Sequence, residues 1–244
     1  MEKIKIAIVG AKGKMGSAVC KRLSRNFDIV EICKGDSFGD FLDVQVVIDF
    51  GSGSSSAESA KWCARKGIPL IIGSTGQSVE EMKTIERAAT KTSILKAGNF
   101  SIGIFVMKKL IDVVLKHRVQ DVVVLEKHHR EKKDNPSGTA LELKAHIEKQ
   151  AKVKDVFGLR GGKEIGMHEV DFYLENELIS IKHQAFSREA FVDGVEKTVQ
   201  FMLKPRSIGM YDFSDVLSQW YLCKKMKYRF DTFTNFWDNI CTEG

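Results

Sequence analysis

Three glycines spaced three residues apart, Gly10, Gly13 and Gly16, separate an apolar run from a helical pattern near the start of the chain. The apolar run, residues 4–9, predicts a strand, and residues 18–23 predict a helix. In such a turn the first glycine permits a tight bend, the second lets the backbone approach a pyrophosphate, and the third lets the helix pack close to the strand. The amides at the helix N-terminus would then face the phosphates. A tight turn without a ligand is the alternative.

Strand and helix patterns continue to alternate beyond this turn. Further strands are predicted at residues 28–33, 44–50, 68–73 and 93–96, and a long apolar helix at residues 102–115. Ser55 and Glu58 have the spacing of a capping box at the start of one intervening helix, and Gly67 is placed to end it. Ser78 and Glu81 have the same spacing at the start of the next. This alternation predicts an α/β fold with a Rossmann-like, doubly wound parallel sheet.

The composition excludes several classes of protein. No apolar run approaches the roughly 20 residues that span a bilayer, and the N-terminus enters a strand pattern instead of a signal sequence. Five cysteines show neither paired spacing nor clustering with histidine, so neither a disulfide framework nor a metal site is expected: Cys20, Cys33, Cys63, Cys223 and Cys241. These features predict a cytoplasmic protein without a metal or a membrane partner.

The chain is basic, with a formal net charge of +6 and a pI near 9.0. Its cations are spread along the whole sequence and match no nucleic-acid-binding motif, so no nucleic-acid partner is expected. A basic balance also favours small anionic ligands such as phosphates and dicarboxylates, because it focuses a positive field into a cleft.

The alternating pattern changes after residue 115. A strand is predicted at residues 122–125, a helix at 141–147, and two strands at 170–174 and 178–185 that form a hairpin around residues 175–177. These elements predict a second, α+β domain for substrate binding and oligomerisation. Its sheet could pack a helix on one face and meet another subunit with the other. We therefore expect a homo-oligomer.

The segment between the first of these strands and its helix, Glu126 to Ala140, reads EKHHREKKDNPSGTA. It concentrates two adjacent histidines, a run of cations and a Pro-Ser-Gly-Thr turn in one strand-to-helix loop, where α/β enzymes commonly keep their chemistry. An anionic substrate that undergoes proton transfer would need such residues. The alternative is a solvated basic loop with a capped helix start.

Taken together, these motifs resemble one family, dihydrodipicolinate reductase (4-hydroxy-tetrahydrodipicolinate reductase) of the diaminopimelate route to lysine. The most specific element is the pattern His-His-x-x-Lys-x-Asp-x-Pro-Ser-Gly-Thr-Ala. It is met by His128, His129, Lys132, Asp134 and residues 136–140. Four further segments match in the family's order: residues 10–16, 72–76 and 99–101, and the pair Ser187 and Arg188.

The resemblance implies that a reduced nicotinamide gives hydride to a cyclic imine dicarboxylate, whose ring then takes up a proton. His128 would supply or relay that proton, because imidazole titrates near neutral pH. Lys132 would donate a proton and also hold a substrate carboxylate. His129, Gly138 and Thr139 would bind carboxylate oxygens. Adjacent side chains of an extended strand point to opposite faces, which leaves open a structural role for one of the two histidines.

The resemblance also implies a set of cofactor-binding residues. These are Gly10, Ala11, Lys12, Gly13, Lys14, Met15, Lys34, Gly73, Ser74, Thr75, Ala97, Gly98, Asn99 and Phe100. Ser74 and Thr75 would approach the nicotinamide, although an ordinary strand-end loop is the alternative. Lys34, at the end of the second strand, favours the phosphate of NADPH, whereas the nearby Asp36 leaves NADH open.

We expect a dinucleotide-binding domain of residues 1–100 and 189–244, a second domain of residues 101–188, and a homotetramer. The other histidines, His117, His146, His168 and His183, are expected in packing or at the surface, with His183 a candidate for a supporting role near Arg188. Asn135 stands where the family usually has alanine. The aromatic tail 218–244 extends past the family's expected end, and its role stays open.

Two other functions remain as alternatives. One is another NAD(P)H-dependent imine reductase or amino-acid dehydrogenase. The other is a catalytically silent dinucleotide-binding regulator, which would need the glycine turn but neither His128 nor Lys132.

Overall fold

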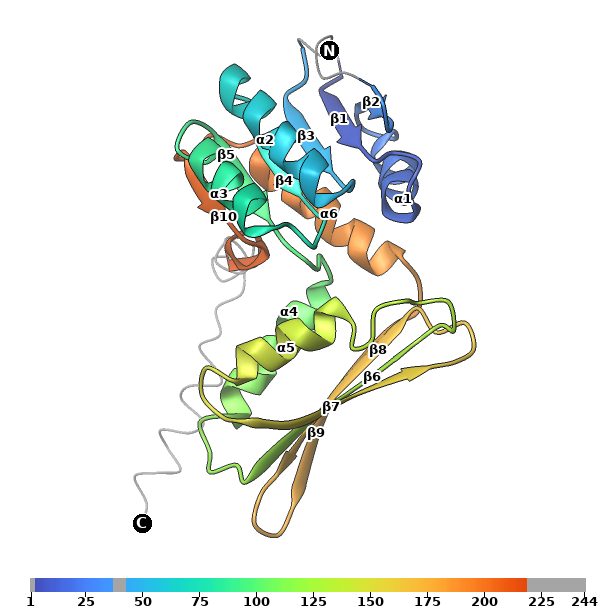
Figure 1. Cartoon of the computed structure of the whole chain (residues 1–244), viewed down its shortest axis with the longest axis vertical. Coiled ribbons are helices and arrows are strands. Elements are labelled where there is room, and N and C mark those ends of the chain that lie inside the picture. The colour runs from blue at the N-terminus through green and yellow to red at the C-terminus, as the bar shows by residue number, and fades with distance from the viewer. Residues whose placement is uncertain (1–2, 37–42, 219–244) are drawn as a thin grey trace, which may run out of the picture.

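A computed structural model describes residues 3–36 and 43–218 of the chain. The aromatic tail lies almost wholly outside the described residues. Two sheets with their helices form two parts of the molecule (Figure 1). The first sheet contains β1 Lys5–Val9, β2 Asp28–Ile32, β3 Val46–Asp49, β4 Leu70–Ile72, β5 Ser93–Lys96 and β10 Gly209–Tyr211.

The strands of the first sheet are all parallel, in the order β10-β5-β4-β3-β1-β2. The chain leaves β1 for β2 on one side and later returns to β3 on the other. The carboxyl end of β1 is therefore a topological switch point, where open α/β sheets bind ligands. The glycine turn follows β1 directly.

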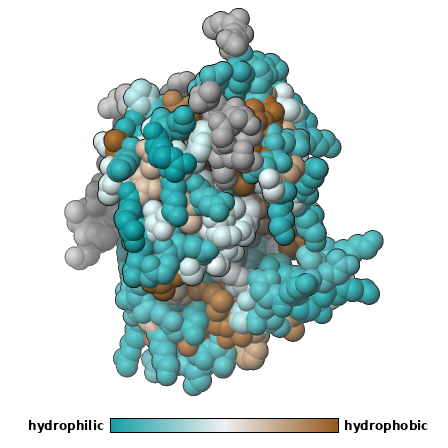
Figure 2. Space-filling model, turned by 45° about the horizontal axis from the view of Figure 1, so that its top comes forward, coloured by the Kyte–Doolittle hydropathy of each residue, from teal (hydrophilic) through white to brown (hydrophobic). Residues whose placement is uncertain are grey.

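Helices cover both faces of this sheet, which explains why its strands are apolar throughout. α1 Lys14–Leu23 and α6 Glu189–Met202 contribute to the core on one face, and α2 Gly53–Lys66 and α3 Val79–Ala88 to the core on the other. The predicted Rossmann-like, doubly wound sheet is confirmed. Figure 2 shows mostly hydrophilic side chains on the face turned to the viewer, with hydrophobic ones gathered low in the view.

One predicted cap is wrong. The N-cap of α2 is Ser52, which forms a reciprocal capping box with Ser55, so Ser55 lies in the first turn and does not pair with Glu58. The hydroxyl of Ser52 reaches the amide three residues on, and the serine-rich sequence offered several equivalent candidates. Gly67 ends α2 in the left-handed conformation, and Ser78 and Glu81 form the predicted capping box of α3.

The second sheet contains β6 Asp121–His128, β7 Val153–Arg160, β8 Gly166–Tyr173 and β9 Leu178–Ala185, in the order β7-β6-β8-β9. β7 runs parallel to β6, and β8 and β9 form the predicted antiparallel hairpin. α4 Ile102–Val114 and α5 Gly138–Ile147 pack on one face of the sheet (Figure 1). The predicted second α+β domain is confirmed.

Three differences from the predicted elements affect the site. β6 continues to His128, three residues past its predicted end, because residues 121–128 alternate between the two faces of the sheet. α5 begins at Gly138, directly after the Pro-Ser turn. The strand β7, which sequence patterns did not indicate, pairs with residues 122–128 of β6. No helix of residues 3–36 and 43–218 is long and apolar enough to cross a membrane.

Candidate active site

A cavity of about 300 Å³ lies between the two sheets. The first domain lines it with residues that follow the carboxyl ends of its strands, including Met15, Phe50 and Gly73. The second domain lines it mainly with His128, which ends β6, and with residues of the loop and helix that follow. The full lining is Met15, Phe50, Gly73, Gly98, Asn99, Phe100, His128, His129, Lys132, Thr139, Ile165, Arg188 and Phe191.

The glycine turn, which reaches the cavity only through Met15, is shaped by its backbone. Gly10 has a positive φ of 74°, and a Cβ there would lie 2.9 Å from the carbonyl carbon of Phe50. A Cβ on Gly16 would overlap the carbonyl oxygen of Gly10, so only glycine lets α1 start this close to β1. Gly13, the N-cap of α1, supplies no side-chain cap, and the first turn holds no acidic residue. The free amides there fit an anion such as a dinucleotide phosphate.

Two charged residues after the end of β2, Asp36 and Lys34, bear on cofactor choice, and their contacts differ. The carboxylate of Asp36 accepts a hydrogen bond from the Cys33 amide (2.7 Å) and so closes the turn on itself. Lys34 is exposed, and no partner for its ammonium lies among the described residues.

The opposite end of the cavity is built on β6. Its side chains alternate, so Val122, Val124, Glu126 and His128 all face the helices. Glu126 is fully buried and His128 is 7% exposed. Two residues apart on one face, they meet in a short hydrogen bond between the Glu126 carboxylate and His128 Nδ1.

Glu126 is ionised despite its burial. Arg160 Nη2 donates to Glu126 Oε1 (2.7 Å), and the Ser137 amide donates to the same oxygen (3.2 Å). Burial favours the neutral acid, but the hydrogen bond from Arg160, the charge that His128 carries when it is protonated and the charge of Arg160 outweigh it, so the pKa of Glu126 lies below its usual value.

His128 is held neutral by its surroundings. Burial lowers the pKa of His128, and the carboxylate of Glu126 raises it without fully offsetting burial, while Lys132 and Arg160 lower it further. His168 lies edge-on to His128, with 5.2 Å between ring centroids. Burial, followed by the charge that His128 carries when it is protonated, lowers the pKa of His168 to about 3.

Glu126, His168 and His183 form a row of polar side chains across three neighbouring strands, which we call the polar row. His168 pairs in register with Glu126, and His183 pairs in register with His168. Their Nε2 atoms contact the N-cap hydroxyls of α5 and α4, Ser137 (3.3 Å) and Ser101 (3.2 Å) respectively. Both histidines therefore hold helix starts, which for His168 is more than the surface or packing role that we predicted, whereas for His183 a supporting role was left open.

Lys132 carries its own counter-ion. Its Nζ atom lies 2.8 and 2.9 Å from the two carboxylate oxygens of Asp134. Burial alone would raise the pKa of Asp134, but the hydrogen bond and charge of Lys132 hold that pKa below its usual value. The second oxygen of Asp134 also accepts from the Gly138 amide (3.4 Å), which links this ion pair to the start of α5.

The start of α5 is tied to the first domain through Thr139. Ser137 is the N-cap, and its hydroxyl accepts from the Ala140 amide (3.2 Å). Asn99 donates to the Thr139 hydroxyl (2.9 Å) and accepts from the Ser101 amide (2.7 Å). Asn99 thereby fixes the strand-end loop of one domain against the helix start of the other.

The structure brings nine of the nineteen predicted site residues to this cavity. His128 and His129 both line it, because the strand ends at His128 and no longer forces its neighbour to the opposite face. Lys14 and Arg188 line an adjoining hollow of about 450 Å³ together with His129. Gly138 borders the cavity through Thr139 without lining it.

Several predicted cofactor residues lie away from the cavity. Ser74 is buried, with its hydroxyl in contact with Ser56 and Gln77, and Thr75 is exposed beside Gly98. Gly10, Ala11, Lys12 and Gly13 form the glycine turn, which does not line the cavity, and Ala97 lines a different hollow.

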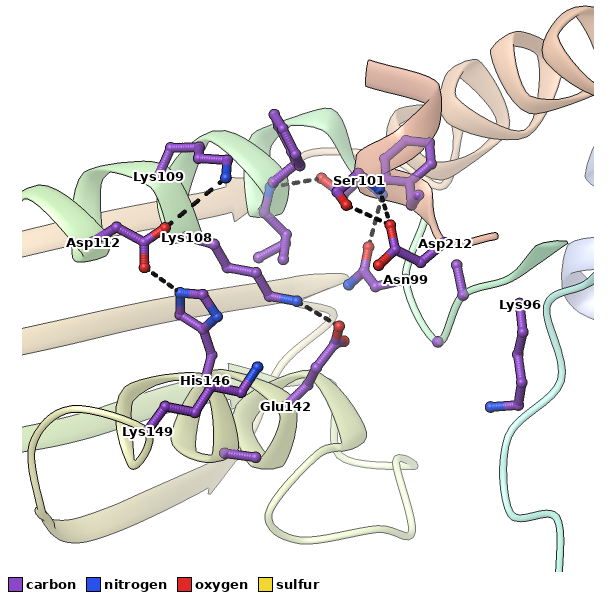
Figure 3. A pocket seen from close by; sticks show the side chains of 17 residues that line it. Lys96, Asn99, Ser101, Lys108, Lys109, Asp112, Glu142, His146, Lys149 and Asp212 are labelled. Carbon is purple, nitrogen blue, oxygen red and sulfur yellow. Dashed lines mark hydrogen bonds and ion pairs between the residues drawn. The ribbon is translucent and has the colours of Figure 1, made fainter. Parts of the chain in front are cut away.

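That larger hollow, about 470 Å³, lies between α4 and α5 near Asp212 (Figure 3). Its charges are largely paired: Lys108 contacts Glu142 across the two helices, and His146 contacts Asp112 (2.6 Å). These pairs join α4 to α5. The smaller cavity is the better candidate site, because it collects the histidines, Lys132 and the residues next to the glycine turn.

Glu126, His128 and His168 each offer one ligand atom within 4.8 Å of the others, a spacing that could hold a metal ion. However, the Arg160 guanidinium already neutralises the carboxylate, and His128 Nδ1 is hydrogen-bonded to it. A divalent cation would have to displace one of these contacts beside a permanent positive charge. We therefore interpret the group as a hydrogen-bond network.

Sequence patterns missed the two residues that organise this network, Glu126 and Arg160. The spacing Glu-x-His within a strand was the available signal for Glu126, since it places both side chains on one face. Arg160 lies on the undetected strand β7, and nothing local in the sequence pointed to it. Phe50, Ile165 and Phe191 were missed for a similar reason, since cavity lining depends on the packing of distant segments.

Comparison with known proteins covers both domains. Residues 4–100 match the family model described as "Dihydrodipicolinate reductase, N-terminus", and residues 103–217 match "Dihydrodipicolinate reductase, C-terminus". The 4-hydroxy-tetrahydrodipicolinate reductase of Archaeoglobus fulgidus is 31% identical, with 88% of this chain and all of that protein covered. The enzyme of the same name from Caulobacter vibrioides is 36% identical, with 88% and 97% covered.

The fold also resembles a solved structure, dipicolinate-bound dihydrodipicolinate reductase from Paenisporosarcina sp. TG-14. The TM-score is 0.70 at 22% identity, and 87% of this chain and 98% of that chain are covered. The match to the C-terminal family model ends at residue 217, so the tail beyond it lies outside the matched residues. With family matches across both domains and relatives above 30% identity over nearly their full length, this chain belongs to the dihydrodipicolinate reductase family.

Proposed function

We propose that the chain is an NAD(P)H-dependent 4-hydroxy-tetrahydrodipicolinate reductase of the diaminopimelate route to lysine. The reaction adds one hydride and one proton to the cyclic dicarboxylate and releases its hydroxyl group as water, which gives tetrahydrodipicolinate. The observation that carries the proposal is the cavity that joins His128, Lys132 and Thr139 to residues beside the glycine turn. A silent regulator would not need this arrangement.

The nicotinamide cofactor, when bound, supplies the hydride. The chain's residues fit such a group, because the glycine turn leaves backbone amides free at the N-terminus of α1, near Lys14. In the second domain, His128 relays the proton, because its neutral ring can take up a proton on Nε2 and pass it on, and Lys132 donates a proton and holds a carboxylate. His129, Thr139 and the Gly138 amide bind carboxylate oxygens at the start of α5, where the helix dipole favours negative charge.

For the choice between the two cofactors, we propose a preference for NADPH. The support is the exposed ammonium of Lys34 beside the end of β2, together with the engagement of Asp36 by the Cys33 amide. Lys34→Gln is expected to raise the KM for NADPH about tenfold and to leave that for NADH within about twofold, since a 2′-phosphate contact is worth roughly 1–2 kcal/mol. Equal changes for both cofactors would remove Lys34 from this role.

The reaction is tested by following NADPH and NADH oxidation with substrate generated in the cuvette from pyruvate and aspartate semialdehyde by a synthase. Oxidation that requires both precursors is the expected result. Tight NADPH binding without oxidation would contradict the proposal and favour the regulator. Oxidation with a different cyclic imine only would favour another imine reductase.

We further propose a homo-oligomer, specifically a tetramer, assembled through the face of the second sheet that carries no helix. Support comes from apolar side chains on that face: Phe157, Leu159 and Leu178 are 52%, 55% and 51% exposed. Phe157→Glu is expected to reduce the mass measured by light scattering, whereas Val79→Glu on the first domain is the matched control. An unchanged mass for Phe157→Glu would contradict this interface.

A cytoplasmic location is the last part of the proposal. It is supported by the free thiols of Cys20, Cys33 and Cys63, because paired cysteines mark oxidising compartments. Fractionation of the source cells, with the protein detected by antibody, is the test.

A further inference from the structure

The carboxylate of Glu126 is the point at which three segments of the second domain meet. It contacts His128 on its own strand, the Ser137 amide at the start of α5, and Arg160 on β7. An ionised carboxylate without solvent exposure is costly to bury, so its retention requires partners that compensate for it. Among these partners, His128 lines the candidate active site, Ser137 starts the helix that carries Thr139, and Arg160 contacts the loop that carries Lys132.

We propose that the Glu126–Arg160 ion pair positions the site: it fixes the proton of neutral His128 on Nδ1, leaves Nε2 for the substrate, and anchors the loop that carries Lys132. The consequence for catalysis rests on the proposed reductase function. The consequence for His128 itself does not, because it follows from the hydrogen bonds alone.

The first step concerns the His128 ring. An ionised carboxylate can only accept hydrogen bonds, so its contact with Nδ1 requires a proton on that nitrogen. The neutral ring carries one proton, so Nε2 is left as an acceptor. Nε2 has no hydrogen-bond partner among the described residues and lies beside Gly166, where a Cβ would approach it to 2.9 Å. The missing side chain keeps this nitrogen accessible.

The second step concerns the loop. The same Arg160 nitrogen that binds Glu126 also donates to the main-chain carbonyl of Asp134, whose side chain holds Lys132. Arg160 thus links the Glu126 carboxylate, which binds His128, to the backbone of Asp134, whose side chain binds Lys132. One guanidinium therefore sets the relative position of the two groups to which we assign proton transfer.

The third step concerns charge. Four charged or titratable groups face His128 from the elements around it: Glu126 on β6, Arg160 on β7, Lys132 in the following loop and His168 on β8. Among them only Glu126 favours the imidazolium form. Loss of its charge would lower the pKa of His128 further, so any limb of the pH profile that reports His128 must move to lower pH.

Glu126→Gln tests the ring directly. Arg160 and the Ser137 amide both require an acceptor, so the glutamine carbonyl is expected to face them and its NH₂ group to face His128. An NH₂ group donates, so Nδ1 must then become the acceptor and the proton must move to Nε2. Long-range ¹H–¹⁵N spectra of histidine-labelled protein distinguish the two tautomers. We expect Nδ1–H in the parent protein and Nε2–H in the variant.

The kinetic readout separates positioning from general damage. Glu126→Gln is expected to lower kcat by about 10- to 100-fold, with the KM for NADPH within about twofold, because only the proton-transfer groups are displaced. In its pH–rate profile, the limb that reports His128 should lie at lower pH than in the parent protein. The matched control is Glu169→Gln on β8, which pairs with Lys182 (3.7 Å) on the opposite face of the sheet and should change none of these quantities.

A second variant covers the case in which Glu126→Gln fails to fold because Arg160 is left buried without a counter-ion. Glu126→Gln combined with Arg160→Met removes both charges. This double variant is expected to fold, to show no single Nδ1–H tautomer of His128 and to keep the depressed kcat.

Four outcomes overturn the proposal: an unchanged tautomer in the single variant, a single Nδ1–H tautomer in the double variant, unchanged kcat in either, or stoichiometric metal in the purified parent protein. If the reductase assay itself fails, the tautomer experiment still decides the structural part.

Discussion

The two ends of the cavity are built in different ways. Beside the first-domain end, which the turn from Gly10 to Gly16 reaches through Met15, the turn offers backbone amides, and its shape depends on side chains that are absent. At the second-domain end, Glu126, Arg160 and Lys132 form charged contacts that each need a particular partner. A backbone site tolerates changes of charge but not of volume, whereas a side-chain network tolerates neither the loss of a charge nor of a partner.

The largest expected effect is at the side-chain end. Lys132→Ala removes a proton donor and a carboxylate contact, so turnover should fall by on the order of a hundredfold or more. NADPH binding, measured by fluorescence titration, should remain, because the glycine turn is untouched. Lys133→Ala is the neighbouring control. Unchanged turnover of Lys132→Ala would remove this residue from the mechanism and weaken the contrast between the two ends.

At the backbone end, volume should matter most. Gly16→Ala places a methyl group against the backbone of Gly10 and Ala11, which cannot move without opening the turn. Overpacking of this kind costs about 1–3 kcal/mol, so both Tm and NADPH affinity should drop. Gly161→Ala, where a Cβ would meet nothing within 4 Å, is the control. Unaltered affinity in Gly16→Ala would show that the turn does not bind the cofactor.

The stability of the two domains should also change in opposite directions when the pH falls. The pKa of His168 is about 3 when folded and 6.5 for the free group, so the unfolded state binds the extra proton and stability falls as the pH drops below 6.5. Glu126 and Asp134, whose pKa values are lowered, lose their contributions at still lower pH. Asp49 in the first domain has a pKa raised by burial, so acid favours its folded, protonated form.

On acidification from about pH 6.5 to about pH 5, the free energy of unfolding of the second domain should therefore fall by about 2 kcal/mol. That of the first domain should not fall. Amide exchange in β6 and β8, corrected for intrinsic rates and compared with β3, measures this difference. His168→Gln should reduce it, and His117→Gln, at an exposed position, should not. Equal losses in both sheets would contradict the assignment of acid sensitivity to the polar row.

The smallest expected effect is at Asn135, the departure from the family pattern. Its side-chain amide donates to the Gly158 carbonyl (3.2 Å) at an exposed position, outside the charged contacts of Glu126 and Lys132. Asn135→Ala should cost less than about 1 kcal/mol and leave kcat within about twofold. Urea unfolding and the reductase assay measure both. A large loss of activity would extend the side-chain network to a residue that we place outside it.

The sequence was sufficient where a local pattern determines local structure. The glycine spacing, the alternation of strands and helices and the hairpin of β8 and β9 each follow from neighbouring residues, and the structure confirms them. β7 was missed because residues 153–160 form an edge strand in which charged residues and Gly158 interrupt the alternation. β10 has only three residues, too few to show a period.

The candidate site was predicted as a set of residues, but not as a network. His128, His129 and Lys132 came from one contiguous motif, which chain connectivity alone brings together. The partner of His128 is two residues away, yet its importance depends on Arg160, which β7 delivers from more than thirty positions along the chain. Tertiary pairing of that kind leaves no periodic trace in a single sequence.

In the role that we propose for Lys132, its ion pair with Asp134 means that a substrate carboxylate enters this position by exchange. The ammonium already has a carboxylate partner held two residues away, at an effective concentration far above that of any free anion in solution. Small ions such as chloride gain little by binding there, because they must first break the internal pair. An incoming molecule succeeds only when its other contacts, at His129 and at the start of α5, hold it in place during the exchange.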